Sequence, residues 1–238
     1  MKKLNALYVS LVALVLAVVA LVMNFVCCKS STDVESALMA KPQIIINAMQ
    51  AYEQQQREEA LKKVEENIKA NAEELYNRAD DGIIGNPDGK IVLVEFFDYS
   101  CGFCGKLHPV LKQIVADNPD VKVVAKPMAF LSPASKYAAE ASLAAVEQGK
   151  FAEVYNAIFE VEGRLDETKI NAAAEKAGVD MEKLKADMKS DKVKNTLKSV
   201  SDLANKIQVT GVPTLVLNNK ILQTLDVKVI QEAIDAAK

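Results

Sequence analysis

Hydrophobic and polar positions divide the chain into successive parts. An uncharged apolar stretch occupies residues 4–28, and a short polar segment follows at residues 30–42. Residues 43–80 contain neither glycine nor proline and are rich in Ala, Glu, Gln, Lys and Asn. Residues 81–238 combine short β-branched runs with amphipathic stretches. This pattern predicts an N-terminal membrane segment, a linker, a helical stalk and an α/β domain.

The apolar stretch is long enough to cross a bilayer. Lys2 and Lys3 precede it, which favours an orientation that leaves the rest of the chain in the periplasm. A secretory signal peptide has a shorter apolar core and small residues at its cleavage site, whereas this stretch ends in Cys27 and Cys28. We therefore expect residues 1–29 to be an uncleaved anchor in the inner membrane, with a cleaved signal peptide as the alternative.

Apolar residues recur at intervals of seven in the predicted stalk, at Leu61, Ile68 and Leu75. A helix that cannot bury such a stripe by itself tends to self-associate, so we expect residues 43–80 to support a homo-oligomer. The wholly polar residues 53–59 interrupt the stripe. A helix packed on its own domain is therefore the alternative.

The pattern of residues 81–238 predicts a β-sheet whose strands are separated in sequence by a helical block. An apolar run at residues 91–97 predicts a strand buried on both faces, residues 121–125 and 214–217 predict two more, and Asn218-Asn219 turns the last into a short fourth strand. Helices are predicted at residues 106–117, 133–147, 151–160, 167–176, 181–188, 191–206 and 227–237. The block at about residues 130–190 is therefore expected to be an insert in an α/β fold.

Cys101 and Cys104 follow the first predicted strand, at the start of a predicted helix. Backbone N–H groups and the helix dipole stabilise a thiolate at such a position, and a second cysteine one turn later can resolve a mixed disulfide. Structural zinc needs four ligands, but His108 is the single histidine and there is no second CxxC, so no zinc site is expected. The pair is therefore predicted to carry redox chemistry.

Glu95 is the one charged residue in the buried run at residues 91–97. Burial of an isolated carboxylate is costly, so we expect a raised pKa for Glu95. A carboxyl of that kind is suited to passing a proton to and from Cys104.

Pro213 stands at the start of the strand predicted at residues 214–217. Proline is tolerated at a strand end, and a cis bond before it would free the backbone of Val212 to pair with an extended substrate. Val212 and Pro213, together with Gly102 and Phe103 between the cysteines, are the predicted substrate contacts.

Composition and charge exclude other classes of function. The formal net charge is -3, and acidic and basic residues are interspersed, so no basic stripe is present and nucleic acid is not expected as a partner. Half of the residues are hydrophobic, which is enough for a sizeable core. Cys101 and Cys104 are the only cysteines of the domain and are too few for a disulfide framework, which again favours a chemical role.

In this order, the sequence Glu-Phe-Phe-Asp-Tyr at residues 95–99, the CxxC pair, and Gly-Val-Pro-Thr at residues 211–214 resemble the DsbA family of thioredoxin-fold proteins. Within that family the chain is similar to the suppressor-of-copper-sensitivity C subgroup, over about residues 67–238. The resemblance implies a thioredoxin fold with an inserted helical domain. It also implies roles for four residues: Cys101 as nucleophile, Cys104 as resolving thiol, Glu95 as buried acid and Pro213 as a cis-proline.

The resemblance further implies exported proteins with cysteines as substrates, a membrane redox partner that resets the pair, and no cofactor beyond the redox-active disulfide. Gly-Phe between the cysteines is similar to the Gly-Tyr of isomerases, and Val212 is similar to the family's oxidases. Oxidase, isomerase and reductase directions stay open because spacing does not set a reduction potential. A copper(I)-buffering protein that uses the same two cysteines is an alternative of another class.

Overall fold

The computed structural model describes residues 13–23, 34–222 and 224–238. The chain forms two compact units, residues 1–60 and residues 61–238. Helix α2 (Gln43–Ala70) begins in the first unit and ends in the second.

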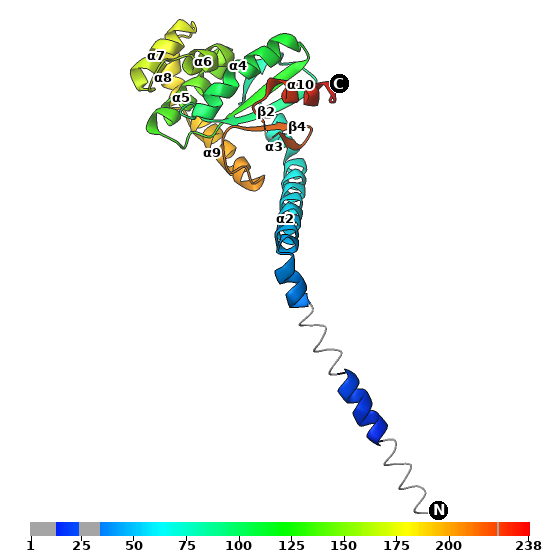
Figure 1. Ribbon diagram of the computed structural model, residues 1–238. Coiled ribbons are helices and arrows are strands. Elements are labelled where there is room, and N and C mark those ends of the chain that lie inside the picture. The colour runs from blue at the N-terminus through cyan, green and yellow to red at the C-terminus, as the bar shows by residue number, and fades with distance from the viewer. Residues whose placement is uncertain (1–12, 24–33, 223) are drawn as a thin grey trace, which may run out of the picture. The chain divides into compact units, whose positions relative to one another are not determined.

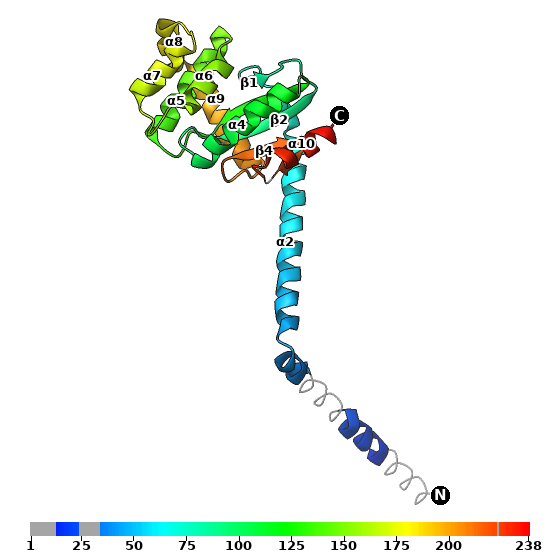
Figure 2. The same ribbon diagram turned by 45° about the horizontal axis from the view of Figure 1, so that its top comes forward.

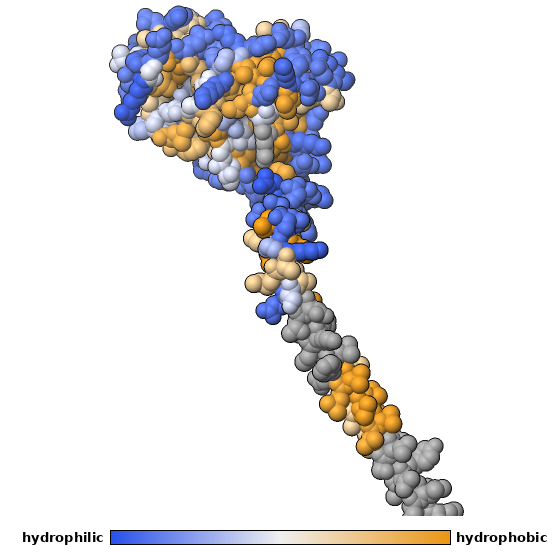
Figure 3. Space-filling model, viewed as in Figure 1, coloured by the Kyte–Doolittle hydropathy of each residue, from blue (hydrophilic) through white to orange (hydrophobic). Residues whose placement is uncertain are grey.

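The described part of the first unit is helical. Residues 13–23 and 34–40 are α-helical, and residues 13–23 present an apolar surface (Figure 3). Among the residues that the structure describes, no helix is both long enough and apolar enough to cross a membrane. Much of the predicted span of residues 4–28 lies outside the described residues, as do Cys27 and Cys28.

A five-stranded sheet forms the centre of the second unit, in the order β1-β3-β2-β4-β5. The strands are β1 (Gly82–Gly85), β2 (Ile91–Phe97), β3 (Val121–Pro127), β4 (Thr214–Leu217) and β5 (Lys220–Leu222). β2 is parallel to β3 and antiparallel to β4, while β1 and β5 are antiparallel edge strands. β2 is therefore central, and its register places Glu95 between Ala125 and Leu215.

Helices cover both faces of this sheet (Figures 1 and 2). They are α3 (Ala72–Tyr76), α4 (Gly102–Asp117), α5 (Pro133–Ala144), α6 (Phe151–Phe159), α7 (Glu167–Lys176), α8 (Met181–Met188), α9 (Asp191–Lys206) and α10 (Val227–Asp235). Leu93 and Phe97 of β2 belong to one core cluster with α4, α6 and α10. Val94 and Phe96 belong to a second cluster with α3 and α9. Because side chains alternate along a strand, Glu95 lies on the same face as α4 and α6.

The helices of the insert begin and end at residues that suit those positions. Side chains of the N-cap residues accept backbone N–H groups in the first turns of four of these helices: Ser132, Asp166, Asp180 and Ser190. Outside the insert, Asp226 caps α10 in the same way. Gly149 and Gly178 have the positive φ of a residue that ends a helical segment. These local signals explain why the helices predicted at residues 133–206 lie close to the observed ones.

The C-terminal part of the predicted stalk packs on the domain. Ile68 at the end of α2 and Leu75 in α3 are completely buried in the second core cluster. The second compact unit begins at Leu61 and so includes residues 61–80. For residues 61–80, the structure therefore has the helix packed on its own domain, which was the alternative to self-association. Their apolar residues Ile68 and Leu75 are covered by the chain's own core.

The fold is a thioredoxin-like α/β fold with a helical block between β3 and β4. The expected strands and helical insert are present, and β1 (Gly82–Gly85) is an additional strand that the sequence pattern did not predict. Two of its four residues are glycine, which weakens any strand signal. Pairing with β3, a tertiary contact, makes this segment a strand.

Candidate active site

The two cysteines stand where the loop after β2 enters α4. Cys101 is the N-cap residue of this helix, and its Sγ accepts the backbone N–H of Cys104 at 3.4 Å. An N–H group directed at sulfur at a helix N-terminus stabilises negative charge on that sulfur. Cys101 is 9% exposed and Cys104 is completely buried, so Cys101 is the more accessible of the two.

The buried Cys104 thiol is held in its protonated form. Burial raises the pKa of Cys104 far above its ordinary value, and negative charge at Cys101 and Glu95 adds to the increase, while a hydrogen bond with the Asp98 backbone lowers it. Because the thiolate is the reactive form of cysteine, Cys104 needs a nearby proton acceptor before it can act as a nucleophile.

Glu95 is the candidate for that acceptor. Its carboxyl is completely buried, and its Oε2 accepts a hydrogen bond from the Tyr155 hydroxyl at 2.8 Å. Burial raises the pKa of Glu95 to about 8, and the Tyr155 hydrogen bond opposes the increase. The predicted burial and raised pKa are confirmed. A carboxyl whose pKa lies near neutral pH exchanges protons readily, while the catalytic role of Glu95 stays a prediction.

Tyr155 is a site residue that the sequence pattern did not indicate. It lies in α6, 60 residues from Glu95 in the chain, and in sequence it has the appearance of an ordinary apolar position in an insert helix. Its ring packs edge-on against Phe97 at 5.2 Å and lies 6.1 Å from the ring of Tyr99. The helical insert therefore supplies the hydrogen bond that orients the buried acid.

Val212 and Pro213, the predicted substrate contacts, lie beside Cys101. The Val212–Pro213 peptide bond is cis, as the resemblance implies, and the carbonyl oxygen of Val212 lies 3.5 Å from Cys101 Sγ. Gly102 and Phe103 are exposed on the outer side of α4, where the Phe103 ring is 59% exposed and lies below Lys106 Nζ at 5.3 Å. The structure thus brings Val212 to Cys101 and leaves Phe103 open to a partner.

Asp98 connects the cysteine loop to the loop after β3. One carboxylate oxygen, Oδ2, accepts the backbone N–H groups of Phe130 and Leu131 at 2.9 and 3.0 Å. The other, Oδ1, accepts the N–H of Ser100 at 2.8 Å and the hydroxyl of Ser135. Phe130 and Leu131 are exposed large apolar residues. Asp98 therefore ties the loop of these two apolar residues to the cysteine loop, a role that its place in the sequence motif did not specify.

His108 packs between α4 and α6. Its Nε2 pairs with Asn156 Oδ1 at 2.8 Å, and its ring stacks on Phe159 at 5.2 Å. Burial lowers the pKa of His108. No group of three or more His, Cys, Asp or Glu side chains in the described ranges could hold a metal ion.

Comparison with known families identifies this arrangement. The family model of the DSBA-like thioredoxin domain matches residues 92–235, more than half of the chain. The chain belongs to the DSBA-like thioredoxin domain family. The matched residues run from β2 through the CxxC helix and the insert to α10, so they include both cysteines, Glu95 and Pro213.

Solved structures of DSBA-like proteins agree with this assignment. A thioredoxin-like oxidoreductase from Silicibacter pomeroyi DSS-3 is 31% identical, with a TM-score of 0.65 over 69% of this chain and 96% of that one. The catalytic domain of Proteus mirabilis ScsC is 28% identical, with a TM-score of 0.65 over 73% and 99% of the two chains. The chain is thus similar to a suppressor-of-copper-sensitivity C protein, as its motifs indicated.

Curated relatives include both short and long proteins. A probable disulfide bond formation protein D of Bacillus anthracis is 26% identical over 68% of this chain and 80% of that protein. The Na(+)/H(+) antiporter NhaA 3 of Salinispora tropica is 25% identical over 59% of this chain but only 22% of the antiporter. The chain spans about a quarter of the length of such antiporters. Their similarity therefore concerns one domain and carries no transport function to this chain.

Proposed function

We propose that this DSBA-like protein forms or shuffles disulfides in exported proteins through Cys101 and Cys104. The observation that carries the proposal is the setting of Cys101. Its Sγ lies between the N–H of Cys104 and the carbonyl of Val212, and Cys101 keeps 9% of its surface exposed, while Cys104 and Glu95 are completely buried. An accessible attacking sulfur, a protected second thiol and a buried proton carrier are the parts that disulfide exchange requires.

In the oxidising direction, a substrate thiolate attacks Sγ of Cys101 in the Cys101–Cys104 disulfide. The bond within the pair breaks, a mixed disulfide forms, and the departing Cys104 sulfur takes a proton from the Glu95 carboxyl. A second substrate thiolate then attacks the substrate sulfur of the mixed disulfide and releases Cys101. Two electrons pass from the substrate to the pair. The substrate loses two protons, one of which replenishes Glu95 while the other goes to Cys101 or to solvent.

In the isomerising direction, the thiolate of Cys101 attacks a substrate disulfide and the mixed disulfide is resolved by another thiol of the same substrate. No net electrons pass in that cycle. The oxidising direction instead needs a partner that accepts two electrons from the reduced pair. We place the protein in the periplasm, anchored by residues 4–28, with a membrane redox protein as that partner, in keeping with the two lysines before the apolar stretch.

A trapping experiment tests this function. A Cys104→Ser variant incubated with a scrambled disulfide-bonded protein is expected to accumulate a mixed disulfide through Cys101, because the resolving thiol is missing. Non-reducing electrophoresis and mass spectrometry of the adduct measure it, and Cys101→Ser is the matched control that should trap nothing. Copper(I) titration of the wild type tests the alternative. Copper(I) binding by the pair without any trapped substrate would contradict exchange and favour copper buffering.

We further propose that the first unit assembles copies of the chain and so favours isomerisation. Large apolar side chains of α2, namely Ile44, Ile45, Ile46, Met49 and Tyr52, are exposed. Exposed apolar residues grouped on one short stretch of helix are typical of an interface. Two or more active sites held in one assembly could act on the same substrate.

Truncation tests the assembly. Light scattering of residues 34–238 is expected to give a dimer or a larger oligomer, and residues 61–238, which form a compact unit, are expected to be monomeric. Reactivation of scrambled substrate should fall with the loss of the oligomer. The same number of chains per particle in the two proteins would contradict this role for residues 34–60.

A further inference from the structure

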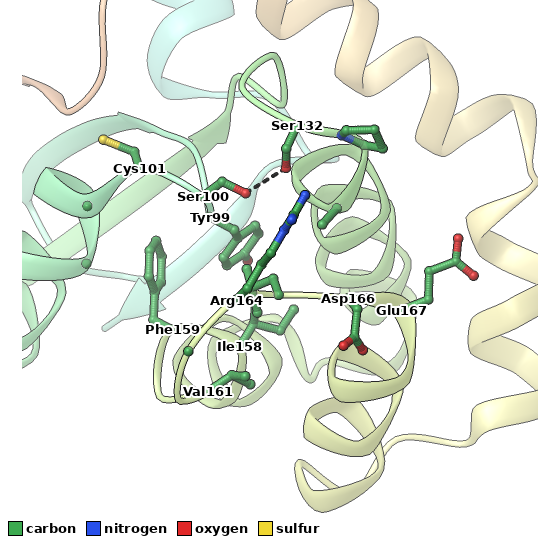
Figure 4. A pocket seen from close by; sticks show the side chains of 16 residues that line it. Tyr99, Ser100, Cys101, Ser132, Ile158, Phe159, Val161, Arg164, Asp166 and Glu167 are labelled. Carbon is green, nitrogen blue, oxygen red and sulfur yellow. Dashed lines mark hydrogen bonds between the residues drawn. The ribbon is translucent and has the colours of Figure 1, made fainter.

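A cleft of about 680 Å³ adjoins Cys101 between the cysteine loop and the helical insert (Figure 4). Its volume lies in the range of pockets that take small ligands or a few side chains. Its lining includes Ser100 and Cys101 of the cysteine loop, Ser132 before α5, and Arg164, Asp166 and Glu167 around the start of α7. A chain bound to the Cys101 sulfur can therefore place neighbouring groups in the cleft.

The loop that carries Arg164 is fixed by the chain itself. Lys169 Nζ donates to the carbonyl oxygens of Glu162 and Arg164 at 2.9 and 3.1 Å. Gly163 between them has a φ of 75°, which favours glycine at that position. Asp166 then caps α7 by accepting the N–H of Lys169 at 2.9 Å. The backbone of Arg164 is thus held in place before any substrate arrives.

Arg164 extends into the cleft toward the Ser100 and Ser132 hydroxyls, which are 2.7 Å apart (Figure 4). The carboxylates of Asp166 and Glu167 point away from it in the same view. Two neighbouring carboxylates have other partners: Glu160 pairs with Lys112 at 2.7 Å, and Asp166 accepts the N–H of Lys169. Within the described part of the chain, Arg164 forms no ion pair, although acidic residues surround it in sequence.

This set of donors matches one kind of ligand. A guanidinium presents several N–H groups in a planar fork that fits both oxygens of a carboxylate. One hydroxyl of the Ser100–Ser132 pair donates to the other, which leaves one hydroxyl proton of the pair for a further hydrogen bond. We propose that the cleft is a subsite for a carboxylate that the substrate carries close to its reacting sulfur, held by Arg164 with Ser100 and Ser132. The inference rests on the proposed disulfide exchange. The carboxylate can come from an Asp or Glu near the substrate cysteine or from a small thiol such as glutathione.

Peptide disulfides test the subsite. Matched peptides carry Glu, Gln or Lys within two residues of the cysteine, on either side, and kcat/KM is measured for the full-length wild type, Arg164→Gln and Lys136→Gln. Lys136 is the matched control because it is an exposed cation on α5 that does not line the cleft. We expect the wild type to prefer Glu over Gln by roughly three- to ten-fold, mostly through KM, as for a partly exposed charge-assisted pair. The preference should vanish in Arg164→Gln and persist in Lys136→Gln.

Small thiols distinguish the source of the carboxylate. Glutathione disulfide and its ethyl ester are compared on the same variants. A loss in Arg164→Gln limited to the peptides supports a polypeptide ligand, and a loss limited to free glutathione disulfide supports a small thiol. An unchanged preference for Glu in Arg164→Gln, or no preference in the wild type, overturns the subsite while leaving exchange intact. Absence of exchange with every substrate overturns the proposed function together with the subsite.

Discussion

Between pH 5 and pH 9 the reduced protein is expected to lose about 4 kcal/mol of unfolding free energy that a Glu95→Gln variant retains. The folded-state pKa of Glu95, about 8, lies above the ordinary value of 4.5, so the folded protein binds this proton more tightly than the unfolded chain. The resulting stabilisation is complete below pH 4.5. It is lost as the pH rises through 8, where the buried carboxyl becomes charged.

Urea denaturation of the wild type and Glu95→Gln at pH 5, 7 and 9 measures this effect. The difference between their unfolding free energies should change with pH. Glu182→Gln, at an exposed position of α8, is the control and should follow the wild type at each pH. Tyr155→Phe removes a hydrogen bond that lowers the pKa of Glu95, so it should move the loss to higher pH. A wild-type-to-Glu95→Gln difference that is equal at pH 5 and pH 9 would show that Glu95 does not titrate in this range.

Replacement of Lys126 by methionine is expected to cost about 3–5 kcal/mol of unfolding free energy, because it leaves a buried carboxylate without its partner. Lys126 in β3 and Asp81 form an ion pair in which both side chains are at most 1% exposed, and Lys126 Nζ also donates to the carbonyl of Glu74 in α3. Burial raises the pKa of Asp81 and lowers that of Lys126, each opposed by the charge of the other. The pair ties α3 and the start of β1 to the centre of the sheet.

Chemical denaturation of a double-mutant cycle separates the interaction between Lys126 and Asp81 from the cost of burying each charge. Lys126→Met combined with Asp81→Leu should recover most of the loss, since apolar residues often replace a buried ion pair at little cost. Lys112→Met breaks the exposed Lys112–Glu160 pair, whose side chains are 57% and 49% exposed, and should cost about 0–1 kcal/mol. An equal cost for Lys126→Met and Lys112→Met would rule out burial as the source of the effect.

Much of the fold was predictable because its signals are local. The apolar run at residues 91–97 contains enough β-branched and aromatic side chains to specify a central strand without further information. Residues Ser132, Asp166 and Ser190 cap their helices through hydrogen bonds to residues only three positions away. Strand β1, in contrast, has little strand signal of its own and depends on its pairing with β3.

The sequence by itself determined the reactive parts of this protein: the CxxC pair at a helix start, the single acid in a buried strand, and the proline before a strand. Each is defined by residues within a few positions of one another. Tertiary structure alone decided what surrounds them. It brought the Tyr155 hydroxyl to Glu95, the Phe130 N–H to Asp98, and Arg164 into the cleft beside Cys101. Helix and strand periodicities come from near neighbours in the chain, whereas a hydrogen-bond partner 60 residues away depends on how the insert packs against the sheet.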